Sequence, residues 1–173
     1  MKLFIPLATG QSIPNQVYVS LSQQTINIDI IPCCTPGVIN SNHTQNPDQI
    51  AKQIGEVASR NVALDLMEPL DDEFVLMQDR DVIHLDGNNY AAAIEYLKNN
   101  PDVGMVSLPW RDNFVSDHIR MQALTIRKAA LTNFRFRVNK RPCLCYVVAE
   151  DMAKNNWKYL FLPGSKRLID ELR

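Results

Sequence analysis

Two aspartates separated by one residue, Asp79 and Asp81, are the part of this sequence best suited to chemistry. Residues two apart point to the same face of an extended strand, and in a turn their carboxylates can still converge on one cation. Mg²⁺ and Mn²⁺ prefer carboxylate oxygens and often complete their coordination with substrate phosphates. Such a metal neutralises charge on a diphosphate leaving group. The pair therefore predicts a Mn²⁺ or Mg²⁺ site that binds a diphosphate, with a solvated acidic turn as the alternative.

The aspartates directly follow an apolar segment, residues 74–77 (FVLM), which is typical of a buried strand. Two other predicted strands end in small or polar residues, at 8–10 (ATG) and 33–35 (CCT). Ligands of α/β folds bind at the carboxyl ends of the strands. We therefore expect these three segments to converge on one binding site.

The elements that must position this site alternate along the chain. The segments 121–127 and 142–148 are ambiguous, residues 165–173 are a charged terminal helix or tail, and the polar segments 35–48 and 109–117 are loops. The order predicts one domain, residues 1–173, with an α/β fold and a mainly parallel central sheet flanked by helices. The expected strands are 3–7, 27–32, 74–77, 103–108 and 158–162, and the expected helices are 14–24, 47–66, 87–98, 128–133 and 149–156.

Composition limits the classes of protein to consider. Of the 173 residues, 46% are hydrophobic and 21% are charged, which is ordinary for one globular domain. The formal net charge is −1, so charge gives no support for a nucleic-acid partner. The apolar run at the N-terminus is too short for a signal peptide, and no segment reaches the roughly 18 apolar residues of a membrane helix. The sequence therefore predicts a cytoplasmic protein without a membrane span.

The four cysteines are spaced as C-C at 33–34 and C-x-C at 143–145. This spacing differs from the paired C-x-x-C of structural zinc sites. A cytoplasmic setting argues against structural disulfides. We expect four reduced cysteines in buried strands, with a metal site built from all four as the less favoured alternative.

Short segments in a fixed order suggest a family. They read F-I-P at 4–6, S-L-S-Q-Q-T at 20–25, I-D-I-I at 28–31, A-S-R-N at 58–61, V-L-M-Q-D-R-D at 75–81, A-L-T-I-R-K at 123–128 and N-W-K-Y-L-F-L-P-G at 156–164. Together they resemble the family 2-like glycosyltransferases with the GT-A fold, over nearly the whole chain. The resemblance implies a metal-dependent enzyme that moves a sugar from a nucleotide-diphosphate-sugar donor to an acceptor hydroxyl.

The resemblance also implies roles for individual residues. Asp79 and Asp81 would hold the metal, and Asp79 and Arg80 would also lie at the diphosphate. Arg60 of the A-S-R-N segment would approach the nucleotide, with a helix-surface charge as the alternative. The base pocket would be lined by Pro6, Ala8 and Thr9, and by Cys34, which follows the second expected strand.

Two departures from the family pattern concern acids. The family's second strand ends in an aspartate that contacts the base or ribose, whereas residues 32–37 read PCCTPG. Inverting members carry the catalytic base in a segment that corresponds to residues 140–145, which contains no carboxylate. Such a base removes the proton of the acceptor hydroxyl. Asp117, His118 and Glu150 are the candidates to replace it, and a free histidine with a pKa of about 6.5 suits this work.

Three functions stay open at this point. The first is the transferase, and the second is a catalytically degenerate GT-A-like module that binds a nucleotide, a glycan or a partner. The third is a nucleotidyltransferase, although residues 7–11 (LATGQ) are a poor version of the phosphate loop of that class. The chain is short for the family, which favours a small acceptor, a partner protein or a homo-oligomer that completes the site.

Overall fold

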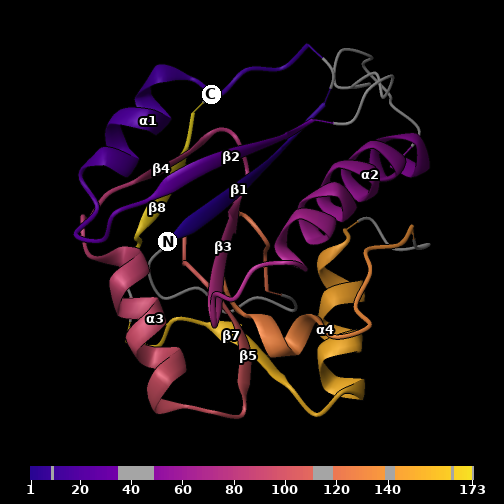
Figure 1. Ribbon diagram of the computed structural model, residues 1–173. Helices are drawn as coiled ribbons and strands as arrows, with labels where there is room; N and C mark the ends of the chain where they lie inside the picture. Colours follow the sequence, from indigo (N-terminus) through magenta and orange to yellow (C-terminus); the bar gives the residue numbers. More distant parts are fainter. Residues whose placement is uncertain (9, 35–48, 111–118, 139–142, 165, 173) are drawn as a thin grey trace.

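A computed structural model describes residues 1–8, 10–34, 49–110, 119–138, 143–164 and 166–172, with the backbone alone for 49–54. Its strands form a six-stranded sheet in the order β2-β1-β3-β6-β5-β7 and a two-stranded sheet of β4 and β8 (Figure 1). The strands are β1 (Lys2–Leu7), β2 (Asp29–Cys34), β3 (Phe74–Gln78), β4 (Val82–His84), β5 (Val103–Ser107), β6 (Ala123–Arg127), β7 (Lys158–Phe161) and β8 (Ile169–Glu171). The helices are α1 (Asn15–Ser22), α2 (Gln49–Met67), α3 (Asn89–Asn99) and α4 (Cys145–Lys154), with a 3-10 turn η1 (Lys128–Leu131).

The large sheet is mainly parallel. β1 pairs in parallel with β2 and β3, and β5 pairs in parallel with β7. Only β6, among the described strands of this sheet, runs antiparallel to its neighbours, β3 and β5. The predicted α/β fold with a mainly parallel sheet and flanking helices is confirmed.

Helices cover both faces of this sheet (Figure 1). α1 and α3 bury Val17, Leu21, Tyr90 and Leu97 in one hydrophobic cluster. The opposite cluster contains buried side chains of α2 and α4, among them Leu64, Met67, Val148 and Met152. Alternate residues of β1 enter the two clusters, because successive side chains of a strand point to opposite faces.

The structure resolves two segments that were ambiguous in the sequence and corrects the expectation for a third. The ambiguous segment 121–127 contains β6, and α4 begins inside the ambiguous segment 142–148, at Cys145. The expectation of a terminal helix or tail at 165–173 is wrong, because β8 pairs antiparallel with β4. Ile169 of β8 is fully buried, so hydrophobic burial holds this short strand in place.

The expectation of four reduced cysteines in buried strands is also wrong. Cys33 is buried, but Cys34 is exposed at the end of β2. Cys143 and Cys145 form a disulfide at the start of α4. No cluster of ligating side chains that could hold a metal ion is found among the described residues, which gives no support to a four-cysteine site.

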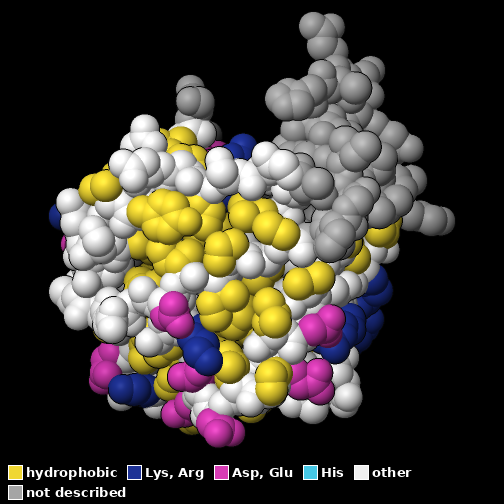
Figure 2. Space-filling view, turned by 45° about the horizontal axis from the view of Figure 1, so that its top comes forward, with side chains coloured by type: hydrophobic (Ala, Val, Ile, Leu, Met, Phe, Trp, Pro, Cys, Tyr) yellow, Lys and Arg dark blue, Asp and Glu magenta, His cyan; other side chains and the backbone are white. Residues whose placement is uncertain are grey.

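The surface of the described part carries exposed hydrophobic side chains. Tyr18 and Val19 of α1 are the largest such group close together in sequence. On the face shown in Figure 2, hydrophobic side chains gather in the middle and charged ones lie mostly along the lower margin. None of the described helices is long and apolar enough to cross a membrane. The predicted loop at 35–48 and most of the one at 109–117 lie outside the described residues.

Candidate functional site

The carboxyl ends of β1, β2 and β3 lie side by side at one edge of the central sheet. Pro6 of β1 is aligned with Cys33 of β2. On the other side of β1, Phe4 is aligned with Met77, so the residues after β3 reach the level of Pro6. The structure thus brings together several of the predicted site residues, namely Pro6, Ala8, Cys34, Asp79, Arg80 and Asp81.

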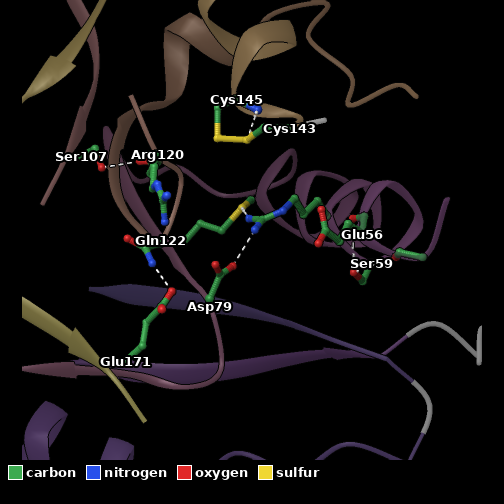
Figure 3. A network of polar contacts seen from close by, with 12 residues as sticks. Glu56, Ser59, Asp79, Ser107, Arg120, Gln122, Cys143, Cys145 and Glu171 are labelled. Carbon is green, nitrogen blue, oxygen red and sulfur yellow. Dashed lines mark hydrogen bonds and ion pairs between the residues drawn. A yellow bond between two sulfur atoms is a disulfide. The ribbon is translucent and has the colours of Figure 1, made fainter. Parts of the chain in front are cut away.

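Arg60 of α2 reaches this edge from the side. Its guanidinium donates through Nη2 to Asp79 Oδ1 at 2.5 Å, and its Nη1 lies 3.4 Å from Met77 Sδ. Figure 3 shows Asp79 facing α2, the helix that carries Glu56 and Ser59. Arg60 is only 6% exposed, which excludes the alternative of a helix-surface charge.

The electrostatic environment of Asp79 is strongly perturbed. The pKa of its carboxyl is raised to about 6, chiefly by burial and also by the nearby carboxylates of Asp81 and Glu56, while Arg60 lowers it. At neutral pH the carboxylate is therefore largely ionised, with Arg60 as its counterion. The Arg60 side chain is buried and that of Asp79 is 35% exposed, so removal of Asp79 would leave the buried guanidinium without its counterion.

Asn61, the neighbour of Arg60, anchors the segment on the other side of α2. Its side-chain amide donates to Phe136 O at 3.0 Å and accepts from Phe136 N at 2.9 Å. The ring of Phe136 lies with its centroid 5.8 Å from the Arg60 guanidinium carbon. In the A-S-R-N segment, Arg60 thus contacts Asp79, and its neighbour Asn61 contacts the segment 134–137.

The loop after β1 is tied to the acidic turn. Arg80 donates through Nη1 to Ser12 O at 3.2 Å. Gln11 accepts from Ala8 N through its side chain at 3.0 Å and donates from its own backbone to Ala8 O at 3.0 Å. Arg80 therefore positions Ala8 and its loop beside the aspartates.

The donor set around Asp81 limits how a divalent metal could bind. The carboxylate of Asp81 has no hydrogen bond or ion pair with the described residues, whereas Asp79 gives one oxygen to Arg60. No three His, Cys, Asp or Glu side chains of the described chain converge closely enough to hold an ion. Mg²⁺ and Mn²⁺ sites with one or two carboxylates rely on substrate phosphates for further ligands. These residues fit a metal shared with a diphosphate and do not fit an ion held by protein side chains alone.

A further acid that the sequence analysis missed lies at the same edge. Glu171 of β8 accepts a hydrogen bond from Gln122 Nε2, and Gln122 in turn accepts one from Asp79 N through its backbone oxygen at 2.8 Å. Figure 3 shows Gln122 and Glu171 beside Asp79. Neither residue belongs to a motif, and the contact between them spans 49 positions, so no local signal could have revealed it.

A buried network of neutral groups adjoins the acidic turn through Gln78, the residue before Asp79. Gln78 Oε1 accepts from Tyr90 Oη at 2.8 Å and from His84 Nε2 at 3.0 Å. His84 Nδ1 lies 3.3 Å from Asn89 Nδ2, which also donates to Leu168 O at 2.7 Å. Burial lowers the pKa of His84 to about 4, so the ring is neutral at physiological pH. The network joins β3, β4 and α3 next to the acidic turn.

Four predicted site residues are not brought to this cluster by the described structure. Thr9, Asp117 and His118 lie outside the described residues. Glu150 is exposed on α4, where its charge acts on Arg137. The segment 143–145, where the resemblance led us to look for a base, contains the Cys143–Cys145 disulfide and no carboxylate.

No protein-family model matches the sequence, and no curated protein matches it. Solved structures do match. A mannosyltransferase from Pyrobaculum calidifontis, in complex with GDP-mannose and Mn²⁺, has a TM-score of 0.66 at 12% identity, over 94% of this chain and 54% of its own. TarS 1–349 from S. aureus has a TM-score of 0.61 at 12% identity, over 98% of this chain and 59% of its own. Glucosyl-3-phosphoglycerate synthase from Mycobacterium tuberculosis, with Mg²⁺ and UDP, has a TM-score of 0.61 at 9% identity, over 99% of this chain and 71% of its own.

The chain has the GT-A fold. At identities of 9–12%, this similarity establishes the fold alone. The chain spans about half of the length of the mannosyltransferase, 54%. On the GT-A sheet, the Asp79-Arg80-Asp81 turn follows β3 at the carboxyl edge, where ligands of open α/β sheets bind.

Proposed function

We propose that this protein is a metal-dependent glycosyltransferase that moves a sugar from a nucleotide-diphosphate-sugar donor to an acceptor hydroxyl. One observation carries the proposal: the Asp79-Arg80-Asp81 turn stands at the ligand-binding edge of a GT-A sheet, and the Asp81 carboxylate has no partner among the described residues. A bound Mn²⁺ or Mg²⁺ would neutralise charge on the diphosphate.

The residues of the edge divide the work of binding the donor. Asp81, with the second oxygen of Asp79, would hold the metal beside the diphosphate. Arg60 keeps the Asp79 carboxylate in place through its ion pair, and Arg80 joins the turn to Ser12 in the segment after β1. Pro6, Ala8, Thr9 and Cys34 would line the base pocket, since β1 and β2 end there.

Nucleotide binding gives the first test. The protein is heated with UDP, GDP or TDP, each with and without Mn²⁺. A diphosphate at 100 times its dissociation constant stabilises the fold by about 2.7 kcal/mol, which raises the melting temperature by roughly 5–10 °C for a chain of this size. Because the described residues offer no complete ligand set, Mn²⁺ alone should give little shift. Asp81→Asn should remove the shift that requires Mn²⁺ and the diphosphate together.

The matched control is Asp102→Asn. Asp102 is an exposed acid that precedes β5, at the edge of the sheet opposite the site. It pairs with Lys158, the first residue of β7. It should leave the nucleotide-dependent shift unchanged. Equal shifts for wild type and Asp81→Asn, or none for any diphosphate, would refute the proposed site.

A non-catalytic GT-A-like binding module is the second candidate. The observation that favours it is the absence of a carboxylate at Cys34 and in the 143–145 segment. Slow hydrolysis of a UDP-, GDP- or TDP-sugar with Mn²⁺ distinguishes the two, because a transferase can use water as a poor acceptor. Metal-dependent binding without hydrolysis of any donor would favour the module.

We also propose a cytoplasmic location and a partner protein or second copy that completes the site, for which the exposed Tyr18 and Val19 offer apolar surface. The sequence offers Asp117, His118 and Glu150 as candidates for the base.

A further inference from the structure

We propose that Glu171, positioned by Gln122, is the group that accepts the proton of the acceptor hydroxyl. This inference rests on the proposed transferase function. It assigns the base to a strand at the C-terminal end of the described chain, which the sequence pattern did not single out.

The backbone places Glu171 next to the acidic turn. Val82, the residue after Asp81, is aligned with Glu171 in the antiparallel ladder of β4 and β8. The next residue, Leu172, donates from its backbone to Asp81 O at 2.8 Å. The carboxylate of Glu171 is thus attached to the same turn that carries the proposed metal ligand, through a register that leaves little freedom.

Gln122 holds the carboxylate and is itself well fixed. Its Nε2 donates to Glu171 Oε1, and its backbone oxygen accepts from Asp79 N. The residues just before it are anchored by two hydroxyl groups: Ser107 Oγ donates to Arg120 O at 2.5 Å, and Tyr159 Oη donates to Ile119 O at 3.1 Å. A base held by a fixed second group keeps the orientation that proton transfer requires.

Gln122 also has an unmet hydrogen-bonding capacity. Its side chain is 6% exposed, and its Oε1 is buried with no partner among the described residues. Turning the amide over would bring Oε1 against the Glu171 carboxylate, so the carboxylate fixes the orientation. A buried acceptor without a donor is rare in folded proteins. Because this oxygen is buried, Gln122 acts on the Glu171 carboxylate through its Nε2 donor and not by contact with the acceptor molecule.

Four other described acids are less suited to the task. Asp79 is committed to Arg60, and Asp81 is the proposed metal ligand. Glu56 lies on α2, where its charge acts on Asp79, and Glu150 is exposed on α4, away from this edge. Among the described residues, Glu171 has a hydrogen bond to one oxygen, so its other oxygen can face an incoming hydroxyl.

The proposed step balances as a single displacement. Glu171 Oε2 takes the proton from the acceptor O–H, and the acceptor oxygen forms a bond with the anomeric carbon. The bond between the anomeric carbon and the phosphate oxygen breaks, and its electron pair leaves with the nucleoside diphosphate. The sugar is transferred with inversion, and Glu171 later returns its proton to solvent.

Donor hydrolysis with Mn²⁺ tests the assignment, with UDP-glucose, UDP-galactose and GDP-mannose as donors and water as the acceptor. Glu171→Gln should lower the hydrolysis rate by about 10²–10⁴-fold, the range for loss of a general base, while binding of UDP or GDP with Mn²⁺ stays unchanged. Glu171→Ala with sodium azide is the sharper variant. Azide has no proton to lose, so it should restore donor cleavage and yield a glycosyl azide, detected by mass spectrometry.

Gln122→Leu tests the positioning role. It should lower the turnover number of hydrolysis with the KM for the donor unchanged, and the rate of azide cleavage should stay near that of wild type. A merely structural role would depress both reactions together or change donor binding. Asp102→Asn serves again as the control that leaves every rate unchanged.

The outcomes separate this inference from the function on which it rests. If wild type hydrolyses a donor and Glu171→Gln does so equally well, the assignment of Glu171 is wrong and the transferase stands. The same holds if Asp117→Ala or His118→Ala, and not Glu171→Ala, is rescued by azide. If wild type binds nucleotides with Mn²⁺ but cleaves no donor, the transferase function itself fails, and the assignment fails with it.

Discussion

His84 is held neutral by groups that are themselves uncharged. Its two ring nitrogens contact Gln78 and Asn89, and the ring of Tyr90 lies 4.7 Å away between centroids. Protonation would place a second proton where Asn89 already presents its amide and would charge a side chain that is 7% exposed. This accounts for the lowered pKa of about 4.

We expect His84 to make the fold less stable in mild acid. In the unfolded chain its pKa is 6.5, so between pH 6.5 and 4 the unfolded state binds more protons and the stability falls as the pH falls. The loss from this residue should reach about 2 kcal/mol by pH 5 and be absent above pH 7. Urea denaturation across this range measures it. His84→Gln should be less stable at pH 7.5 yet lose less stability on acidification.

Asp79 changes the stability with pH in the opposite direction to His84, which provides an internal check. Its pKa is raised from 3.8 to about 6, so the folded state binds the extra proton and acidification favours folding through this group. Both proteins contain Asp79, so the difference between their pH profiles isolates His84. Parallel profiles for wild type and His84→Gln would mean that His84 titrates normally in the folded protein.

At the level of single residues, the sequence allowed part of the site to be predicted. Asp79, Arg80 and Asp81 could be found because an apolar strand and a D-x-D spacing are local signals. Arg60 could be placed at the site, but its ion pair with Asp79 depends on how α2 packs against β3. Gln122 could not be found, because its importance comes from contacts made only in the folded chain.

Among the elements, β5 packs very closely against its neighbours. Gly104 in this strand lies next to Ala130 of η1 and to Trp157, the residue before β7. A Cβ at this position would lie 2.7 Å from Ala130 Cβ and 3.0 Å from Trp157 Cβ. The ladder of β5 and β7 also shifts register between Val103 and Met105. The lack of a side chain is therefore what lets η1 and Trp157 pack onto β5.

Gly104→Ala should destabilise the fold by about 1–3 kcal/mol, because the methyl group overpacks this contact. The free energy of unfolding in urea is the measurement. Gly10→Ala is an informative comparison: Gly10 has open space around it but a φ of +80°, so any cost there comes from the backbone alone. If Gly104→Ala were neutral, the contact with η1 would have to be looser than the structure indicates.

Helices with a periodic apolar pattern and strands with a continuous apolar run were predictable, whereas the three-residue strands were not. The expected helices at 14–24, 47–66 and 87–98 correspond to α1, α2 and α3, and the apolar segments 74–77 and 103–108 to β3 and β5. β4 and β8 have three residues each, too few for a periodic pattern, and the charged residues around β8 suggested a terminal helix or tail. Pairing between distant segments gives these strands their conformation, and a local pattern carries no information about it.

For the molecule as a whole, β8 connects the C-terminal segment to several distant parts of the chain. Leu85 donates to Leu168 O at 2.9 Å, and Leu168 donates to Pro109 O at 2.8 Å. Ile169 is fully buried in the cluster that also contains side chains of α1 and α3. Trp157 packs against the cluster on the opposite face of the central sheet. Because both clusters rest on the same strands, we expect them to unfold together.

Ile169→Ala tests this coupling. Removal of a buried isoleucine side chain should cost about 2–5 kcal/mol. In a Trp110→Phe background, the fluorescence of Trp157 reports on the opposite face, and its midpoint in urea should fall as far as the midpoint from far-UV circular dichroism. Asp170→Asn, on the same strand but in a half-exposed pair with Arg167, should cost less than about 1 kcal/mol. Two separate transitions, or a Trp157 midpoint that Ile169→Ala leaves in place, would show that β8 and its cluster unfold independently of the other face.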